Sequence, residues 1–428
     1  MRPTVAILGW YGSPNLGDEA ELAAILDQLA ALRPPPAVTV FSHRPAHTRA
    51  AHDAYAGGLR VLARNPFAPA ALRALHRSRL LILGGGGLIQ DQTSVYNLPI
   101  FTVFGVVAAA LRCPLFWWGV GVEPLVTAFG RAQARLLVRL APPGGVRVRD
   151  AQSRRILLAA GVPPARVVVS ADPAVTRYQG SGIRYQGFLT TGDNLAPDTP
   201  QSARIESQTT DHGPRATERV AFCVRDWPNN PQGGGVGYLL PVAAQRRLGL
   251  GGRAGAAHGR RAAAFYAQLA AAADHLIERY GVQVLFVSLW PGRDDAIAAQ
   301  VRGQMRHADC APAYAAPLTP AQARALLGTM DLVVAVRLHA LIFAAAAGVP
   351  GVGFAYARKI RGFMARTGQA DAVLDPATLT QAQLTATLDR VWAQRAALRV
   401  TLKAHMAQLQ ALAAGDAAWV RAWLAAVG

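Results

Sequence analysis

The sequence is short of cysteine, of acidic residues and of long apolar runs, and each shortage excludes a class of protein. Only three cysteines occur among 428 residues, at Cys113, Cys223 and Cys310, and none forms a C-x-x-C pair. A disulfide scaffold is therefore excluded, and a reducing compartment is favoured. The uncharged run over residues 340–357 contains Gly348-Val349-Pro350, which predicts a buried helix, a turn and a buried strand rather than a membrane span. The ten histidines are scattered along the chain and form no H-E-x-x-H motif, so we expect no metal.

The scarcity of acid leaves a strongly basic chain. Lys and Arg number 44 against 25 Asp and Glu, a formal net charge of +19, while a hydrophobic content of 52% excludes disorder of the whole chain. Such charge suits an anionic partner, either nucleic acid, a membrane surface or a small anion. No nucleic-acid-binding module is recognisable and the aromatics do not interleave with the basic residues, so we expect no nucleic acid. We expect a cytoplasmic protein, and peripheral contact with the anionic inner face of the membrane is one of two interpretations of the charge. The other interpretation, which needs no anionic partner, is that most of the basic residues form a solvated basic face.

Short apolar runs alternate with helical stretches in two parts of the chain, which predicts parallel sheets covered by helices. We expect an N-terminal Rossmann-like domain over residues 1–175, an irregular insertion over 176–218, and a C-terminal Rossmann-like domain over 219–378. The second domain would contain an irregular basic stretch at 245–261. The chain would end in two helices, over 379–414 and 417–427. The predicted fold class is α/β, with two doubly wound domains facing across a cleft.

Two glycine-containing loops follow predicted strands of the first domain. The loop Gly12–Glu19 has phosphate-loop glycine spacing but continues with Asp18-Glu19 instead of Lys-Ser/Thr, so an ATP site is rejected. Asn15 and Asp18 would either begin a helix or face a ligand at the mouth of the sheet. The second loop runs from Gly84 to Asp91 and opens with four glycines. Gly85 and Gly86 would let a ligand approach the backbone and would offer N–H groups to an anion, unless the loop is only a tight turn.

Basic side chains end two further predicted strands. Arg149 is the last residue of the predicted strand 146–149 and Asp150 follows it. The two residues would either face the cleft or form only a surface ion pair. Arg337 and His339 follow residues 332–336, and Lys359 comes after the next strand. A guanidinium binds a carboxylate or phosphate through two parallel hydrogen bonds, and a histidine exchanges a proton near neutral pH. The sequence therefore predicts an anion site with a proton donor, unless these residues only cap a helix.

Taken in order, these motifs resemble the polysaccharide pyruvyl transferases, including those that modify secondary cell-wall polysaccharide. The matching segments span most of the chain and are Gly9–Gly12 with Asn15 to Glu19, Gly84–Asp91, Trp118–Gly121 with Pro124, Val148–Asp150 with Ser153, Ala171–Pro173, and Arg337–Ala340 through Gly348–Pro350 to Tyr356 and Lys359. The resemblance implies a fold like that of the two-domain, GT-B type glycosyltransferases. The stretches 177–218 and 245–261 depart from the pattern as insertions.

The resemblance also implies the chemistry. The donor would be phosphoenolpyruvate, and its pyruvyl group would form a ketal across two hydroxyls of a cell-wall glycan or lipid-linked saccharide, with release of phosphate. No metal or organic cofactor is expected. We assign His339 as general acid and Asp18 as the residue that orients or deprotonates an acceptor hydroxyl. The donor contacts would come from basic and loop residues, and Asn15 and Asp91 would lie on the acceptor side. The residues expected to contact the donor are Arg149, Arg337, Lys359, Gly85 and Gly86.

Two other functions compete with this interpretation. A GT-B glycosyltransferase with a nucleotide-sugar donor would need a carboxylate in the second domain for the ribose. No clear Glu is present there, since Asp331 precedes a predicted strand and Asp294-Asp295 begin a predicted helix. A non-enzymatic basic protein that binds acidic polymer would explain the charge but not the ordered motifs, and its binding would depend steeply on salt.

Overall fold

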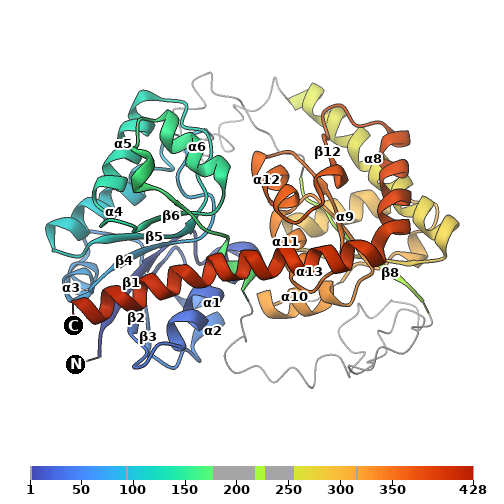
Figure 1. Cartoon of the computed structure of the whole chain (residues 1–428). Helices are drawn as coiled ribbons and strands as arrows, with labels where there is room; N and C mark the ends of the chain where they lie inside the picture. Colours follow the sequence, from blue (N-terminus) through green and yellow to red (C-terminus); the bar gives the residue numbers. More distant parts are fainter. Residues whose placement is uncertain (1, 93–94, 177–216, 227–254, 315–316, 428) are drawn as a thin grey trace. The chain divides into compact units, whose positions relative to one another are not determined.

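A computed structural model describes residues 2–92, 95–176, 217–226, 255–314 and 317–427. The chain divides into two compact units, coloured along the sequence in Figure 1. The first contains residues 1–181, 229–256 and 407–428, and the second contains residues 182–228 and 257–406.

The first unit is built on a seven-stranded parallel sheet in the order β3-β2-β1-β4-β5-β6-β7. Its strands are β1 (Thr4–Leu8), β2 (Ala37–Ser42), β3 (Leu59–Ala63), β4 (Leu81–Gly84), β5 (Leu115–Val120), β6 (Val146–Val148) and β7 (Val168–Val169). Its helices are α1 (Leu16–Ala30), α2 (Pro45–His52), α3 (Pro69–Arg77), α4 (Pro99–Ala110), α5 (Ala128–Arg139) and α6 (Ala151–Ala159), with short 3₁₀ turns η1 (Pro164–Arg166) and η2 (Pro173–Val175). The chain reverses strand order between β1 and β4, which is where open α/β sheets bind ligands.

Alternate residues of the central strands enter two separate cores, one on each face of this sheet. In β5, Leu115 and Trp117 join the core covered by α3, α4, α5 and α6, while Phe116 and Trp118 join the core covered by α1. Strands buried on both faces have continuous apolar sequences, as LFWWGV in β5 does. The face under α1 is completed by the end of the chain, because Trp419 stacks on Phe116 at 4.6 Å between ring centroids.

The second unit contains a five-stranded parallel sheet in the order β12-β11-β10-β8-β9. Its strands are β8 (Arg219–Cys223), β9 (Gln283–Phe286), β10 (Leu332–Ala335), β11 (Gly351–Phe354) and β12 (Val373–Leu374). Its helices are α8 (Gly255–Tyr280), α9 (Arg293–Arg302), α10 (Pro320–Gly328), α11 (Leu338–Ala346), α12 (Arg358–Arg366) and the first part of α13 (Gln381–Ala426), with 3₁₀ turns η7 (Ala308–Cys310) and η8 (Ala370–Ala372). Phe265 of α8 packs edge-on against Phe354 of β11, with ring centroids 5.1 Å apart.

The predicted α/β class with two parallel sheets is confirmed. Helix α10 begins with a capping box at Thr319. The Thr319 side chain accepts from the Gln322 N–H, and the Gln322 side chain accepts in return from the Thr319 N–H. The segment 340–357 forms a buried helix, a turn at Gly348 and the buried strand β11, as expected. The sequence missed β3, a half-exposed edge strand, and β12, which has only two residues.

The prediction of an irregular basic stretch at residues 245–261 needs correction. The basic stretch 245–261 lies outside the described residues up to 254, but from Gly255 onward it is the first part of α8, because its alanine-rich sequence favours a helix. Residues 177–216 of the predicted insertion are outside the described part of the chain.

The two predicted C-terminal helices are one continuous helix, α13. Its residues up to Met406 belong to the second unit and those from Ala407 to the first. The expected break at Gly415-Asp416 does not occur, because one glycine costs a helix only about 1 kcal/mol. Asp416 is fully buried in the first unit, where it accepts hydrogen bonds from Arg147 and from Ser170 Oγ.

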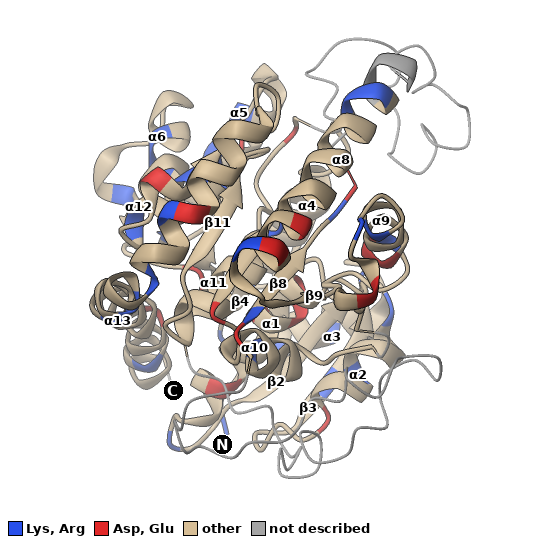
Figure 2. Ribbon diagram, turned by 90° about the vertical axis from the view of Figure 1, so that its right-hand side faces the viewer, with Lys and Arg blue, Asp and Glu red and all other residues tan. Residues whose placement is uncertain are grey.

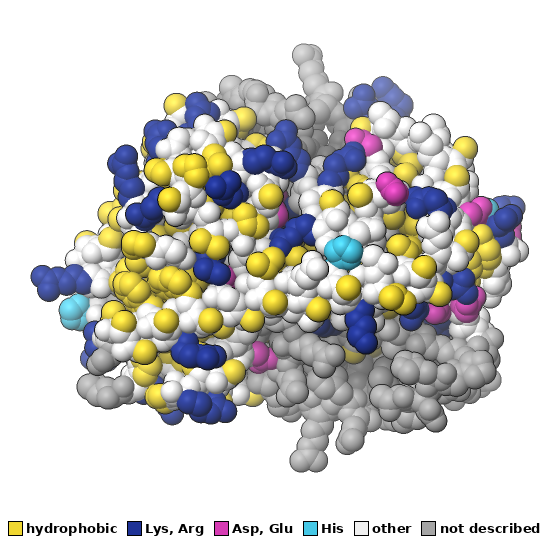
Figure 3. Space-filling model, viewed as in Figure 1, with side chains coloured by type: hydrophobic (Ala, Val, Ile, Leu, Met, Phe, Trp, Pro, Cys, Tyr) yellow, Lys and Arg dark blue, Asp and Glu magenta, His cyan; other side chains and the backbone are white. Residues whose placement is uncertain are grey.

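The positive charge is spread widely over the chain. In Figure 2, Lys and Arg occur on α2, α3, α5, α6, α9 and α12, and Figure 3 shows basic side chains scattered over one face with hydrophobic ones between them. On that face the charge is distributed and does not form a single basic patch. In the described part of the chain, no helix is both long and apolar enough to cross a bilayer.

Candidate functional site

The loop between β1 and α1 is organised by side chains at the helix start. Asn15 is the N-cap of α1: its Oδ1 accepts from the Gly17 N–H at 3.3 Å, and its Nδ2 donates to Asp18 Oδ2 at 2.6 Å. An acid in the first turn is favoured by the helix dipole. The structure thus brings Asn15 and Asp18 together, with Asp18 half-buried. Asn15 and Asp18 therefore begin a helix, which was one of the two predictions for them.

The glycine-rich loop after β4 needs two of its glycines for conformation. Gly85 and Gly86 have φ values of +63° and +70°, which side chains rarely tolerate. A Cβ on Gly85 would also lie 2.5 Å from Glu21 Oε2. Their N–H groups are already used, because Gly85 donates to the Trp118 carbonyl at 3.1 Å and Gly86 donates to Glu21. The loop therefore gives no support to the expected contact of these amides with the donor.

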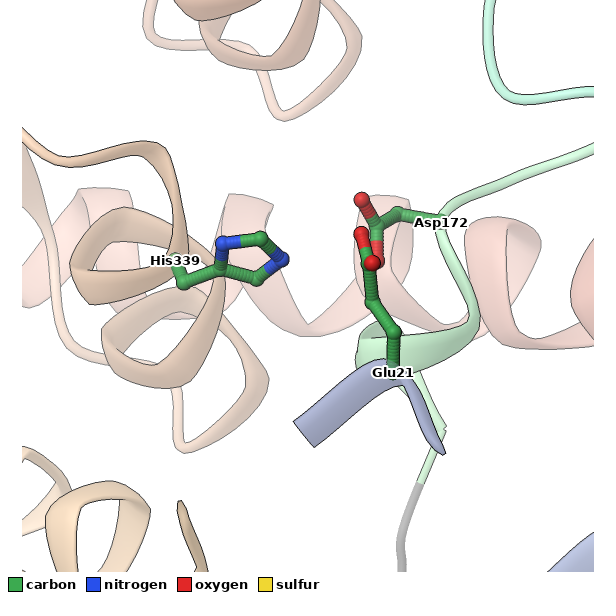
Figure 4. A group of neighbouring side chains, drawn as sticks. All are labelled: Glu21, Asp172 and His339. Carbon is green, nitrogen blue, oxygen red and sulfur yellow. The ribbon is translucent and has the colours of Figure 1, made fainter. Parts of the chain in front are cut away.

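Glu21 of α1 and Asp172, directly before η2, form a buried carboxyl pair that the sequence did not predict (Figure 4). Their side chains are hydrogen-bonded, and such a bond between two carboxyl groups requires a shared proton. Burial first, and then the charge of Asp172, raise the pKa of Glu21 well above its ordinary value, against the opposing effect of Arg149. The sequence contained one indication that Glu21 is buried: it lies four residues before Ile25, on the apolar face of the helix.

Arg149 is buried among carboxylates at the end of β6. Its Nη1 donates to Asp172 Oδ2 at 3.3 Å, its Nε donates to Asp150 Oδ2 at 3.4 Å, and its Nη2 lies 3.9 Å from Glu123 Oε1. Burial alone would lower the pKa of Arg149, but these carboxylates raise it. Asp150 also caps α6 through the Ser153 N–H at 2.7 Å. Acid outnumbers base here, so the surroundings of Arg149 suit polar or cationic groups better than a second anion.

Asp91 has a structural environment. It is 1% exposed, and its carboxylate accepts from the Val126 N–H at 2.7 Å, from the Thr127 N–H at 3.0 Å and from the Thr127 hydroxyl. These bonds fix the segment that leads into α5. The arrangement gives no support to the expected contact with an acceptor.

In the second unit, Arg337 ends β10 and forms a buried ion pair with Asp294 of α9. Its Nε and Nη2 donate to the two oxygens of that carboxylate, and the two side chains are 9% and 1% exposed. Burial raises the pKa of Asp294 although Arg337 opposes it. Arg337 thus makes the predicted pair of parallel hydrogen bonds, but it makes them to Asp294 of the chain itself. Sequence reasoning missed Asp294 because it lies on a different helix, 43 residues earlier.

One aromatic ring, that of Trp290, lies close to two of the guanidinium groups at the carboxyl edge of this sheet. Trp290, in the loop before α9, has the Arg293 guanidinium carbon 4.8 Å from its ring centroid and that of Arg337 at 5.4 Å. Arg293 Nη2 also donates to Asp226 at 2.9 Å. Stacking on an aromatic face orients a guanidinium and removes water from it.

His339 and Lys359 lie at the starts of α11 and α12, which follow the adjacent strands β10 and β11. Because the strands are parallel, both residues lie at the carboxyl edge of the second sheet, as the sequence predicted. Both are half-buried. The His339 ring, which Figure 4 also labels, is 6.2 Å from the Phe343 ring one turn along α11. A proton-exchanging imidazole and an ammonium group thus share one sheet edge with three guanidinium groups, at Arg225, Arg293 and Arg337.

A sequence profile of the family described as "Polysaccharide pyruvyl transferase" matches residues 15–358, most of the chain. The chain belongs to the polysaccharide pyruvyl transferase family. A search of curated proteins gave no match. The family match begins after β1 and includes Asp18, Arg149, Arg337 and His339. It ends at Arg358, one residue before Lys359.

Solved structures similar to this pyruvyl transferase family member share its fold at low sequence identity. A glycosyltransferase from Rickettsia africae has a TM-score of 0.56 and 9% identity, with 99% of each chain covered. A UDP-GlcNAc 2-epimerase from Neisseria meningitidis, bound to UDP-GlcNAc, has a TM-score of 0.55 and 9% identity, with 94% of each chain covered. The UDP-GlcNAc 2-epimerase from Methanocaldococcus jannaschii gives 0.52 and 10%, covering 90% of this chain and 92% of its own. These likenesses establish a fold of the GT-B type.

Proposed function

We propose that the protein transfers the pyruvyl group of phosphoenolpyruvate to a sugar of a cell-wall polysaccharide or its lipid-linked precursor. The product is a pyruvate ketal, and phosphate is released. The observation that carries this proposal is the basic carboxyl edge of the second sheet, in a chain of this family, with His339 and Lys359 at the starts of two adjacent helices. A small multiply charged donor needs cations, and the reaction needs a proton donor.

The proposed roles follow from the environment of each residue. Lys359 binds the donor phosphate, and Arg337 adds positive charge at the strand end while Asp294 holds its fork. Arg149 lies among three carboxylates at up to 3.9 Å, so we give it the role of positioning them and assign the donor to the second unit. Asp18, hydrogen-bonded to Asn15, is the proposed base for an acceptor hydroxyl.

In the proposed reaction, His339 protonates the methylene carbon of the donor, and C2 becomes an oxocarbenium-like centre. One sugar hydroxyl adds to C2, the bond between C2 and the phosphate oxygen breaks, and the second hydroxyl closes the ketal. Of the two hydroxyl protons lost, one replaces the proton given by His339 and the other leaves on phosphate. Removal of a positioned acid of this kind typically lowers a rate by about 10²–10⁴.

The alternative with a specific observation behind it is a nucleotide-sugar glycosyltransferase, since solved structures with this fold are titled as UDP or UDP-sugar complexes. That function requires a carboxylate in the second unit for the ribose. Among the described residues at the sheet edge, Asp294 is held by Arg337 and Asp226 by Arg293. This pairing favours the pyruvyl transfer.

The test is phosphate release by the purified full chain with phosphoenolpyruvate, with and without isolated wall glycan or lipid-linked saccharide. Release that needs both substrates, and that falls at least a hundredfold in His339→Gln, would support the proposal. Hydrolysis of a UDP-sugar with no response to phosphoenolpyruvate would replace it with the alternative.

A further inference from the structure

Arg225, directly beyond β8, has a setting unlike that of the other two arginines at the edge of the second sheet. Its Nη1 donates to the Tyr356 hydroxyl at 2.7 Å, and its guanidinium carbon lies 4.5 Å from the centroid of the Tyr356 ring. Its Nε is buried and has no hydrogen-bond partner within the described structure. The carboxylate of Asp226 is 3.8 Å from Nη2, which is beyond hydrogen-bonding distance.

A comparison with Arg337 shows what is missing at Arg225. Arg337 uses the edge formed by Nε and Nη2 to hold both oxygens of Asp294. The same edge of Arg225 has no oxygen at hydrogen-bonding distance among the contacts of the described residues. Arg293, the third guanidinium, is paired with Asp226 at 2.9 Å. Of these three arginines, Arg225 is therefore the one whose Nε and Nη2 groups could bind an oxyanion through two parallel hydrogen bonds.

A second buried polar atom without a hydrogen-bond partner in the described structure lies at the same sheet edge. It is the hydroxyl of Ser288, just beyond β9. Strands β8 and β9 are parallel neighbours, with Phe222 opposite Phe286, so Val224 and Ser288 occupy the next matching level. An unsatisfied buried donor is costly, and a charged one more so, which favours a bound ligand as partner.

We propose that Arg225 binds an oxyanion of the donor through its Nε and Nη2, and that Tyr356 positions it by stacking and by holding Nη1. The identity of that donor rests on the proposed function. The chemistry of the contact, a planar guanidinium with a carboxylate or phosphate, does not. The Tyr356 phenol fixes the rotation of the guanidinium, so that the open edge is held in one orientation before the anion arrives.

The test is equilibrium binding by calorimetry to the full chain, with phosphoenolpyruvate, inorganic phosphate and pyruvate as separate probes. Arg225→Lys should weaken phosphoenolpyruvate binding at least tenfold, because lysine cannot form two parallel bonds. Whichever of phosphate and pyruvate loses affinity in parallel identifies the group that Arg225 contacts. Tyr356→Phe keeps the ring and removes the hydroxyl, so it should weaken binding less than Arg225→Lys and should raise KM with little change in kcat.

Arg361→Lys is the matched control, since Arg361 is exposed on α12 and pairs with Asp375 at 3.1 Å. It should bind all probes like the wild type. If Arg225→Lys does not fold, the KM effect of Tyr356→Phe decides. Wild-type affinity in a folded Arg225→Lys, or wild-type KM in Tyr356→Phe, would overturn the inference while leaving the transfer reaction intact. Binding that depends on Arg225 without any phosphate release would instead support the inference and contradict the proposed function.

Discussion

The ion pair between Arg337 and Asp294 gives the sharpest prediction about the second unit. Replacing Asp294 by Asn keeps the volume of the side chain but removes the charge from a pair that is 9% and 1% exposed. Breaking a buried ion pair by removing one partner costs about 3–5 kcal/mol, because the other charge stays buried without compensation. Asn retains one acceptor oxygen, so we expect about 3 kcal/mol. For a unit of this size that corresponds to a fall in Tm of about 6–12 °C.

The control is Asp226→Asn, which removes the partner of Arg293 from a pair that is 35% and 41% exposed. Pairs with such exposure contribute about 1 kcal/mol or less. Both variants would be followed by urea unfolding and by scanning calorimetry on the full chain. If Asp294→Asn lost no more stability than Asp226→Asn, the structural role of the Arg337 fork would be refuted, and Arg337 would again be available for a ligand.

Two further predictions concern the first unit. Gly85→Ala should lose more stability than Gly58→Ala. Both positions have positive φ, which costs a non-glycine residue about 1–2 kcal/mol, but only at Gly85 would the new Cβ meet Glu21, at 2.5 Å, whereas the space around Gly58 is open. Equal losses in urea unfolding would contradict the packing of the glycine loop on Glu21. Burial raises the pKa of Asp416 to about 7, so the folded state binds a proton more tightly than the unfolded chain. The free energy of unfolding should therefore fall as the pH rises from about 4 to about 7, and Asp416→Asn should remove that part of the pH dependence; an unchanged slope in the variant would show that another group is responsible.

The fold was largely predictable because buried parallel strands have continuous apolar sequences. Runs such as TVAIL in β1 and LVVA in β10 stand out from the helical stretches between them. The edge strand β3 did not stand out, because exposed residues interrupt its buried ones. Strand β12 has only two residues, which is too short to show an apolar pattern. The continuity of α13 through Gly415-Asp416 was not predicted, and the buried partners of Asp416, Arg147 and Ser170, are remote in the sequence, so no local pattern reveals them.

The candidate site was predictable only in part, for a related reason. The rule that parallel strands end at one edge placed His339 and Lys359 correctly at the carboxyl edge of the second sheet. It could not say which basic residues are already paired. The partner of Arg337 comes from α9, 43 residues away. The buried pair of Glu21 and Asp172 similarly joins residues that are remote in the sequence.

The central claim is that this chain uses phosphoenolpyruvate with a glycan acceptor and needs His339 for the transfer. The most direct measurement is phosphate release by wild type and His339→Gln in parallel, with donor alone, acceptor alone and both together. We expect release only with both substrates, and a rate about 10²–10⁴ lower in the variant at unchanged Tm. A His339→Gln variant with wild-type turnover, or release that does not depend on the acceptor, would contradict the claim.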